Sequence, residues 1–78
     1  MTEELIAVLK TELRDVDQLD LDASLEAVGI DSLRIVNLSV RLEADHGIDV
    51  SFAELNRIKS LRELDALVQR RLTERGPR

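Results

Sequence analysis

The sequence predicts an all-α protein, a small four-helix bundle with three long helices, a short third helix and a long loop between the first two helices. Three observations predict it. Leu, Ile and Val recur at helical spacing in separate segments, Ser and Glu are paired three residues apart at two helix starts, and no segment of useful length alternates like a strand. Because 78 residues can form only one core, we expect a single domain over residues 1–78, with helices packed antiparallel.

The first helix is predicted from Thr2 to about Arg14. Thr2 is a suitable N-cap, and Glu3 and Glu4 lie near the positive end of the helix dipole. Its apolar residues at helical spacing are Leu5, Ile6, Leu9 and Leu13.

An acidic segment follows, from Asp15 to Asp31, with six acidic residues and no basic one. A disordered acidic linker would lack large aliphatic residues, so their recurrence predicts a structured loop anchored on the core. The aliphatic residues are Val16, Leu19, Leu21, Leu25, Val28 and Ile30.

The second helix is predicted to begin after Asp31 and to end at His46, because Gly47 is the residue expected beyond a helix C-terminus. We expect its inward face to include Leu33, Val36, Leu38, Val40 and Leu42.

Two capping boxes mark two further helix starts. Ser51 with Glu54 opens the short third helix, and Ser60 with Glu63 opens the fourth. Gly76 and Pro77 would end the fourth helix. The expected apolar faces are Phe52, Leu55 and Ile58 in the third helix, and Leu61, Leu64, Leu67, Val68 and Leu72 in the fourth.

Composition excludes several function classes. A net charge of −5 and a single aromatic residue, Phe52, argue against a nucleic-acid partner. The N-terminus has no signal-peptide pattern and no apolar run approaches the ~18 residues that span a bilayer, so we expect a cytoplasmic protein without a membrane partner. We also expect a monomer.

The sequence offers no metal site. It has no cysteine and one histidine, which excludes a zinc site. Asp15, Asp17 and Glu26 match three ligand positions of an EF-hand loop, but Asp20 stands where that loop needs glycine. Without the glycine turn, the ligands would not converge on a calcium ion.

No catalytic group is placed beside a nucleophile either. His46 follows Ser32 by fourteen residues, which along one helix is about 21 Å, too far for proton transfer. We therefore expect a protein that is not an enzyme by itself.

One segment remains that could carry chemistry, Val28-Gly29-Ile30-Asp31-Ser32-Leu33, where the loop meets the second helix. Asp31 can cap the helix, and Ser32 falls in its first turn. A phosphodiester on Ser32 would be stabilised by free backbone N–H groups and by the helix dipole. From the hexapeptide alone, a helix cap without further function is the favoured interpretation.

The whole chain nevertheless resembles the acyl carrier protein superfamily. The resemblance rests on Gly29-Ile30-Asp31-Ser32-Leu33, on the helix and loop before it, and on a last helix introduced by Ile58-Lys59-Ser60-Leu61. It implies that Ser32 receives the 4'-phosphopantetheine arm of coenzyme A from a separate transferase. The thiol of the arm then bears intermediates as thioesters.

The resemblance also implies roles near that serine. Asp31 looks like the acid that positions the region for the transferase, and Leu33 like the exposed hydrophobic residue that partners grip. Ile58 resembles the hydrophobic residue that borders the arm, and the second helix resembles the main docking surface. The implied partners are the phosphopantetheinyl transferase, an acyl- or aminoacyl-loading enzyme, and downstream synthase or tailoring enzymes.

The second helix departs from the fatty-acid carriers, whose exposed face is acidic. Here it carries Arg34, Asn37, Ser39 and Arg41. We expect Arg34, Asn37 and Arg41 to contribute to docking, with the arginines meeting acidic residues of the partner. An intrahelical pair such as Arg41 with Asp45 would account for at most one of the two arginines. This favours a dedicated polyketide or nonribosomal-peptide pathway, and the start at Met1 favours a free-standing carrier.

Two other functions remain open at this stage. The chain could be a small helical interaction module in which Ser32 acts only in a helix cap. A helix-turn-helix DNA reader using the basic C-terminal segment is a further alternative, which the negative net charge disfavours. The aliphatic interior is compatible both with holding a growing chain and with excluding it.

Overall fold

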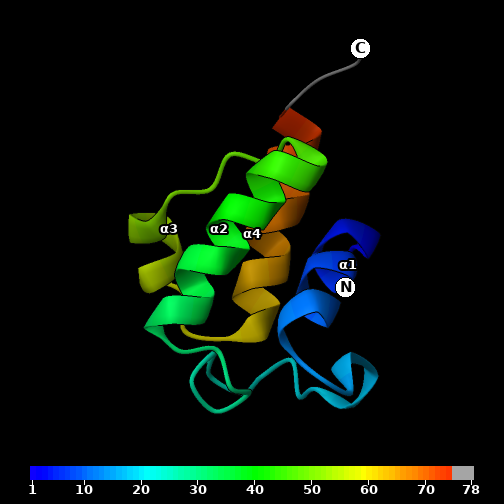
Figure 1. Cartoon of the computed structure of the whole chain (residues 1–78), viewed down its shortest axis with the longest axis vertical. Helices are drawn as coiled ribbons and strands as arrows, with labels where there is room; N and C mark the ends of the chain where they lie inside the picture. Colours follow the sequence, from blue (N-terminus) through cyan, green and yellow to red (C-terminus); the bar gives the residue numbers. More distant parts are fainter. Residues whose placement is uncertain (75–78) are drawn as a thin grey trace.

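The computed structural model describes residues 1–74, which fold as helices without a strand in that part of the chain (Figure 1). This confirms the predicted all-α fold, with a short third helix and a long loop before the second. The elements are α1 (Glu3–Glu12), the 3₁₀ turn η1 (Val16–Gln18), α2 (Ser32–His46), α3 (Phe52–Asn56) and α4 (Leu61–Glu74). The predicted stop at Gly76 and Pro77 lies outside the described residues. None of the described helices is long and apolar enough to cross a membrane.

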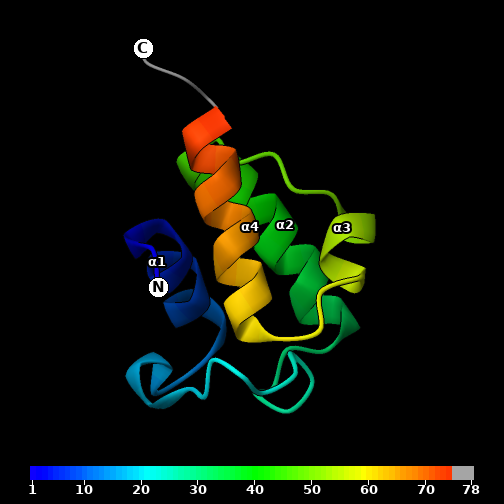
Figure 2. The same ribbon diagram turned by 180° about the vertical axis from the view of Figure 1, so that it is seen from behind.

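The direction of the helices differs partly from the expectation. Helix α1 runs toward the end of the bundle that holds the loop, and α2 and α4 both run away from it (Figures 1 and 2). The antiparallel prediction is therefore right for α1 but wrong for α2 against α4. The reason is that α3 and the connections on either side of it return the chain to the end where α2 begins.

The core is aliphatic and receives residues from all four helices and from the loop. Val16, Leu25 and Ile30 of the loop are buried, which confirms the structured loop. The loop also supports α4, because the carbonyls of Leu21 and Ala23 accept the N–H groups of residues 62 and 61, at 2.8 and 3.2 Å. The other buried residues are Leu5, Val8, Leu9, Ile35, Leu38, Leu42, Ile48, Val50, Leu55, Leu61, Leu64 and Val68.

The start of α1 and both ends of α2 lie where the sequence predicts them. The Thr2 side chain accepts from the N–H of Leu5, and Asp31 caps α2. At the other end of α2, Gly47 takes φ 65°, and Ile48 N donates to the carbonyl of residue 42 at 3.0 Å. A residue other than glycine would be strained in this left-handed conformation.

The predicted inward face of α2 is wrong in part. Leu38 and Leu42 are buried, but Val36 and Val40 are exposed, at 44% and 60%, and so is Leu33, at 70%. Each residue turns an α-helix by about 100°, so Val40 lies about 160° around the helix from Leu42. Ile35, which shares the face of Leu38 and Leu42, takes the third inward position.

The two capping boxes differ. In the first, Ser51 Oγ accepts from Glu54 N and the Glu54 carboxylate accepts from Ser51 N, as predicted. In the second, Ser60 Oγ accepts from Glu63 N at 3.2 Å, but the Glu63 carboxylate accepts from Lys59 N instead. Phe52, expected on an inward face, is 44% exposed, because α3 is only one turn long and Leu55 alone reaches the core from it.

Candidate functional site around Ser32

A single capped turn of the loop leads the chain to Ser32. Ser24 Oγ accepts from the N–H of Ala27 at 3.0 Å and begins the turn. Gly29 ends it with φ 96°, and Ile30 N then donates back to the carbonyl of Leu25 at 2.8 Å. Ile30 enters the core directly after this turn, which fixes the start of α2.

Ser32 occupies the first helical position of α2, and Asp31 is the N-cap before it. The Asp31 carboxylate accepts the N–H of Arg34 at 2.9 Å, and the Asp31 carbonyl accepts the N–H of Ile35 at 2.9 Å. The N–H groups of Ser32 and Leu33 have no acceptor among residues 1–74. They stand at the positive end of the helix dipole, where an anionic group is stabilised.

The hydroxyl of Ser32 differs from every other hydroxyl in the described part of the chain. Ser32 is exposed, and its Oγ makes no hydrogen bond to residues 1–74. Ser24, Ser51 and Ser60 use Oγ to accept backbone N–H groups, and Ser39 donates to a carbonyl at 2.7 Å. The threonine hydroxyls are used as well, in Thr2, Thr11 and Thr73.

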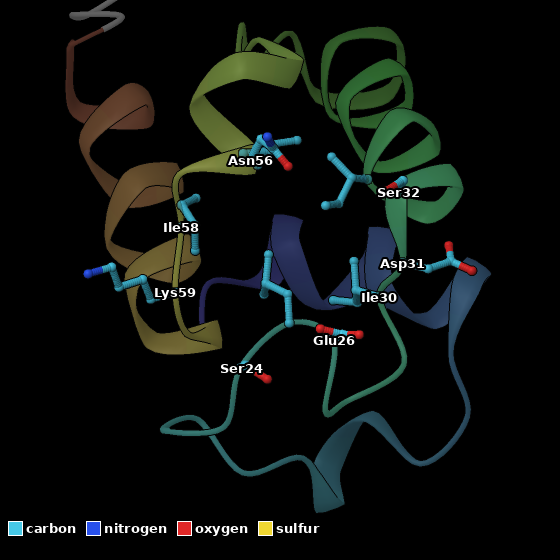
Figure 3. Close-up of a pocket in the computed structure, with 11 residues that line it drawn as sticks. Ser24, Glu26, Ile30, Asp31, Ser32, Asn56, Ile58 and Lys59 are labelled. Atoms are coloured by element: carbon cyan, nitrogen blue, oxygen red, sulfur yellow. The ribbon is translucent and has the colours of Figure 1, made fainter.

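A cavity of about 520 Å³ opens beside Ser32. Ser32 and Asp31 border it from the start of α2, Asn56 from the end of α3, and Ile58 and Lys59 from the segment that joins α3 to α4 (Figure 3). The loop closes it below. The remaining lining residues are Ser24, Leu25, Glu26, Ile30, Ile35 and Leu55.

The cavity has an apolar floor and a polar border. Buried aliphatic residues form the floor, whereas Asn56, Lys59, Ser24 and Glu26 are exposed at its edge. An elongated group attached to the Ser32 hydroxyl would therefore find room beside its attachment point, with apolar surface below it and hydrogen-bonding groups around it. The residues present thus fit a phosphopantetheine arm.

The sequence predicted part of this site. Ser32, Asp31 and Ile58 border one cavity, although Ile58 follows α3 instead of lying within it. The roles that the resemblance implied for these residues stay predictions. Sequence reasoning missed the cavity positions of Ser24, Asn56 and Lys59. Lys59 belongs to the segment before the last helix, and no local pattern distinguishes Asn56 from an ordinary surface residue.

The two arginines predicted for docking both have intramolecular partners. Arg34 Nη1 donates to the carbonyl of Glu12 at the end of α1 and lies 3.9 Å from the Glu12 carboxylate. Arg41 Nη1 lies 3.9 Å from the Asp45 carboxylate one turn later. Arg41 thus forms the intrahelical pair that was expected for at most one arginine, and Arg34 has a partner on another helix that the sequence did not predict.

A smaller hollow of about 340 Å³ lies over α2 on the side of α1. Asn37 and Arg41 border it, together with Val40 and Glu12. The docking roles of Asn37, Arg34 and Arg41 remain predictions.

Two carboxyl groups have a lowered pKa, and neither borders the cavity beside Ser32. The guanidinium of Arg62, bonded to Asp22 at 2.8 Å, lowers the pKa of that carboxyl. The N–H of Ser51, with Arg71 nearby, lowers the pKa of Glu54. The ion pair of Arg62 with Asp22 links α4 to the loop, and the ion pair of Arg71 with Glu54 links α4 to α3. Within residues 1–74 no group of three or more His, Cys, Asp or Glu side chains could hold a metal ion.

Comparison with known families decides how this site is interpreted. The family described as "Phosphopantetheine attachment site" matches residues 3–68, from the start of α1 to the third turn of α4. The chain belongs to this family. It is a carrier domain for a covalently attached 4'-phosphopantetheine and not an enzyme, as the sequence indicated.

A relative of known function is also similar to this carrier domain. It is the highly reducing polyketide synthase pspA of Penicillium soppii, 39% identical over 61 residues. The match covers 78% of this chain and 2% of the synthase, so the chain spans a small part of that protein's length. No solved structure is significantly similar to the chain.

Proposed function

We propose that Ser32 is the attachment site of 4'-phosphopantetheine and that this carrier bears acyl intermediates of a polyketide pathway. The observation that carries the assignment of Ser32 is its hydroxyl, which makes no hydrogen bond within residues 1–74 and borders the cavity of about 520 Å³. The similarity to a polyketide synthase supports the pathway.

The residues around Ser32 have distinct tasks in this proposal. Asp31 caps α2 and keeps the Ser32 hydroxyl free for modification. Gly29 allows the turn that delivers Ile30 to the core and Ser32 to the surface. The N–H groups of Ser32 and Leu33 stabilise the phosphodiester. The arm supplies a thiol, which the cysteine-free chain lacks and which bears acyl groups as thioesters.

The partners follow from this chemistry. A phosphopantetheinyl transferase modifies Ser32, an acyl-loading enzyme charges the thiol, and synthase or tailoring enzymes act on the bound chain. The carrier offers only a hydroxyl, a cavity and a docking surface. We expect it to work as a monomer that meets these enzymes in turn.

The test uses the purified protein with coenzyme A, Mg²⁺ and a promiscuous phosphopantetheinyl transferase, followed by intact-mass measurement. The wild type should gain the mass of one phosphopantetheine group, and Ser32→Ala should gain none while its circular dichroism stays helical. Ser24→Ala is the matched control, because it removes a hydroxyl of the same cavity that already serves in a turn. Modification of Ser32→Ala, or none in the wild type, would contradict the assignment.

A further inference from the structure

The first turn of α2 has few attachments to the rest of the protein. Ser32 and Leu33 are exposed, and the Ser32 hydroxyl makes no hydrogen bond within residues 1–74. Ile35, the first buried residue of α2, comes only after them. Between these two parts lies Arg34, whose Nη1 donates to the carbonyl of Glu12 at the end of α1. Among the described residues, Arg34 thus supplies the side-chain hydrogen bond that joins this turn to another helix.

The contact of Arg34 with α1 has two parts. Glu12 is the last residue of α1, so its carbonyl has no partner within the helix and lies at the negative end of the helix dipole. The guanidinium of Arg34 brings both a donor and a positive charge to this end, and its Nη1 also lies 3.9 Å from the Glu12 carboxylate. The backbone N–H of Arg34 is bonded at the same time to the Asp31 carboxylate, which caps α2. Arg34 is therefore held by α2 at its backbone and by α1 at its side chain.

The carboxylate of Glu12 in turn depends on Arg34. The Glu12 side chain is only 13% exposed, whereas that of Arg34 is 41% exposed. Glu12 Oε1 is buried and has no hydrogen-bond partner within residues 1–74, and Oε2 faces Arg34. A carboxylate so far removed from water is destabilising unless a positive charge compensates it. Without the guanidinium, Glu12 would have to turn toward water, and the contact between α1 and the first turn of α2 would be lost.

We propose that Arg34 is a positioning residue for phosphopantetheine transfer, which acts through Glu12 to hold the first turn of α2 against the end of α1 and so fixes the direction of the Ser32 hydroxyl. The proposal rests on the proposed function of Ser32. It gives Arg34 an internal task in place of contact with an acidic partner. A reacting group displaced by about 1 Å can lose about a hundredfold in rate, so the effect should appear in kcat and should depend on Glu12.

The experiment measures kcat and KM for phosphopantetheine transfer to the full chain, with the promiscuous transferase as the probe, at 50 and 500 mM NaCl. Arg34→Gln should lower kcat about tenfold and change KM less than about twofold. Arg34→Lys, which keeps the positive charge, should stay within about threefold of the wild type. The double variant Arg34→Gln with Glu12→Gln removes the carboxylate left without a cation, so it should regain about threefold of the loss in Arg34→Gln. These ratios should be equal at both salt concentrations, because a partly buried ion pair is little screened.

Arg71→Gln is the matched control. Arg71 also joins two helices by bonding to a glutamate, but its ion-pair partners lie in α3 and α4. Its kcat should stay within about twofold of the wild type, although urea unfolding should show a comparable loss of stability in Arg71→Gln and Arg34→Gln. An equal loss of kcat in both variants would overturn the proposal, because it would trace the effect to general stability.

Two other results would overturn it as well. A rise in KM that changes with salt, without recovery on adding Glu12→Gln, would show that Arg34 contacts an acidic partner. A folded double variant with the wild-type kcat would show that the Arg34 contact is not needed, and this holds even if Arg34→Gln alone does not fold. No modification of the wild type would instead refute the proposed function of Ser32.

Discussion

Alanine substitutions of Leu38 and Val40, which lie about 3 Å apart along the axis of α2, should distinguish its buried face from its exposed face. Leu38 is fully buried, and Leu→Ala in a core costs about 2–5 kcal/mol. Val40 is 60% exposed, so less than half of its side-chain transfer energy is realised, about 0.6–0.8 kcal/mol. Alanine recovers about 0.5 kcal/mol through its higher helix propensity. Leu38→Ala should therefore destabilise strongly, and Val40→Ala by about zero.

Urea unfolding followed by circular dichroism at 222 nm measures the difference. With a slope near 1 kcal/mol/M for so small a domain, Leu38→Ala should lower the midpoint by about 2 M or more, whereas Val40→Ala should stay within ~0.5 M of the wild type. A core of this size supplies only about 3–5 kcal/mol, so Leu38→Ala can unfold outright. Ile35→Val, expected to cost about 0.5–1.5 kcal/mol, then keeps the inward face testable. A midpoint for Val40→Ala as low as that for Leu38→Ala or Ile35→Val would refute the assignment of the faces.

Three further substitutions test the approach to Ser32 and the attachment of α3. Asp31→Ala removes the acceptor of the Arg34 N–H, so stability should fall by about 1 kcal/mol in urea and phosphopantetheine transfer should slow as the first turn frays. Gly29→Ala should cost about 1–2 kcal/mol in the same assay, because an L residue is strained at φ 96°, although a Cβ there would meet only ordinary contact. Glu54 has a lowered pKa in the folded protein, so its contribution is present above the unfolded-state pKa and is lost as the pH falls through the folded-state pKa. Glu54→Gln should accordingly lower the melting temperature at pH 7 more than at pH 3, and an equal loss at both would show that its charge is not involved.

The helix ends were predictable because their determinants are local. Asp31, Gly47 and Ser51 each act within four residues of their own position, through a side-chain cap or a left-handed backbone. Such signals are complete in a short stretch of sequence. The second capping box shows the limit of this reasoning, because Glu63 reaches the N–H of Lys59 one residue earlier than the pattern predicts.

The inward face of α2 could not be assigned from the sequence alone. Between Leu33 and Leu42 apolar residues occupy both sides of the helix, so the 3.6-residue period is satisfied by more than one face. Tertiary packing decides between them, and it buries Ile35, Leu38 and Leu42. The partner of Arg34 is equally non-local, since Glu12 lies twenty-two residues away.

The order of Asp31 and Ser32 explains why a common helix-start sequence leaves a serine available. Serine and aspartate are both good N-caps, and at the cap position either side chain would accept a hydrogen bond from a backbone N–H. Here aspartate takes that position and bonds the N–H of Arg34, which leaves the hydroxyl of the next residue without a structural task in the described chain. The cavity and the unbonded N–H groups of Ser32 and Leu33 therefore lie beside a hydroxyl that makes no hydrogen bond within the described residues. The sequence motif alone could not distinguish this arrangement from a simple cap. The distinction requires the complete set of hydroxyl partners, because Ser32 differs from the other serines by the hydrogen bond that it does not make.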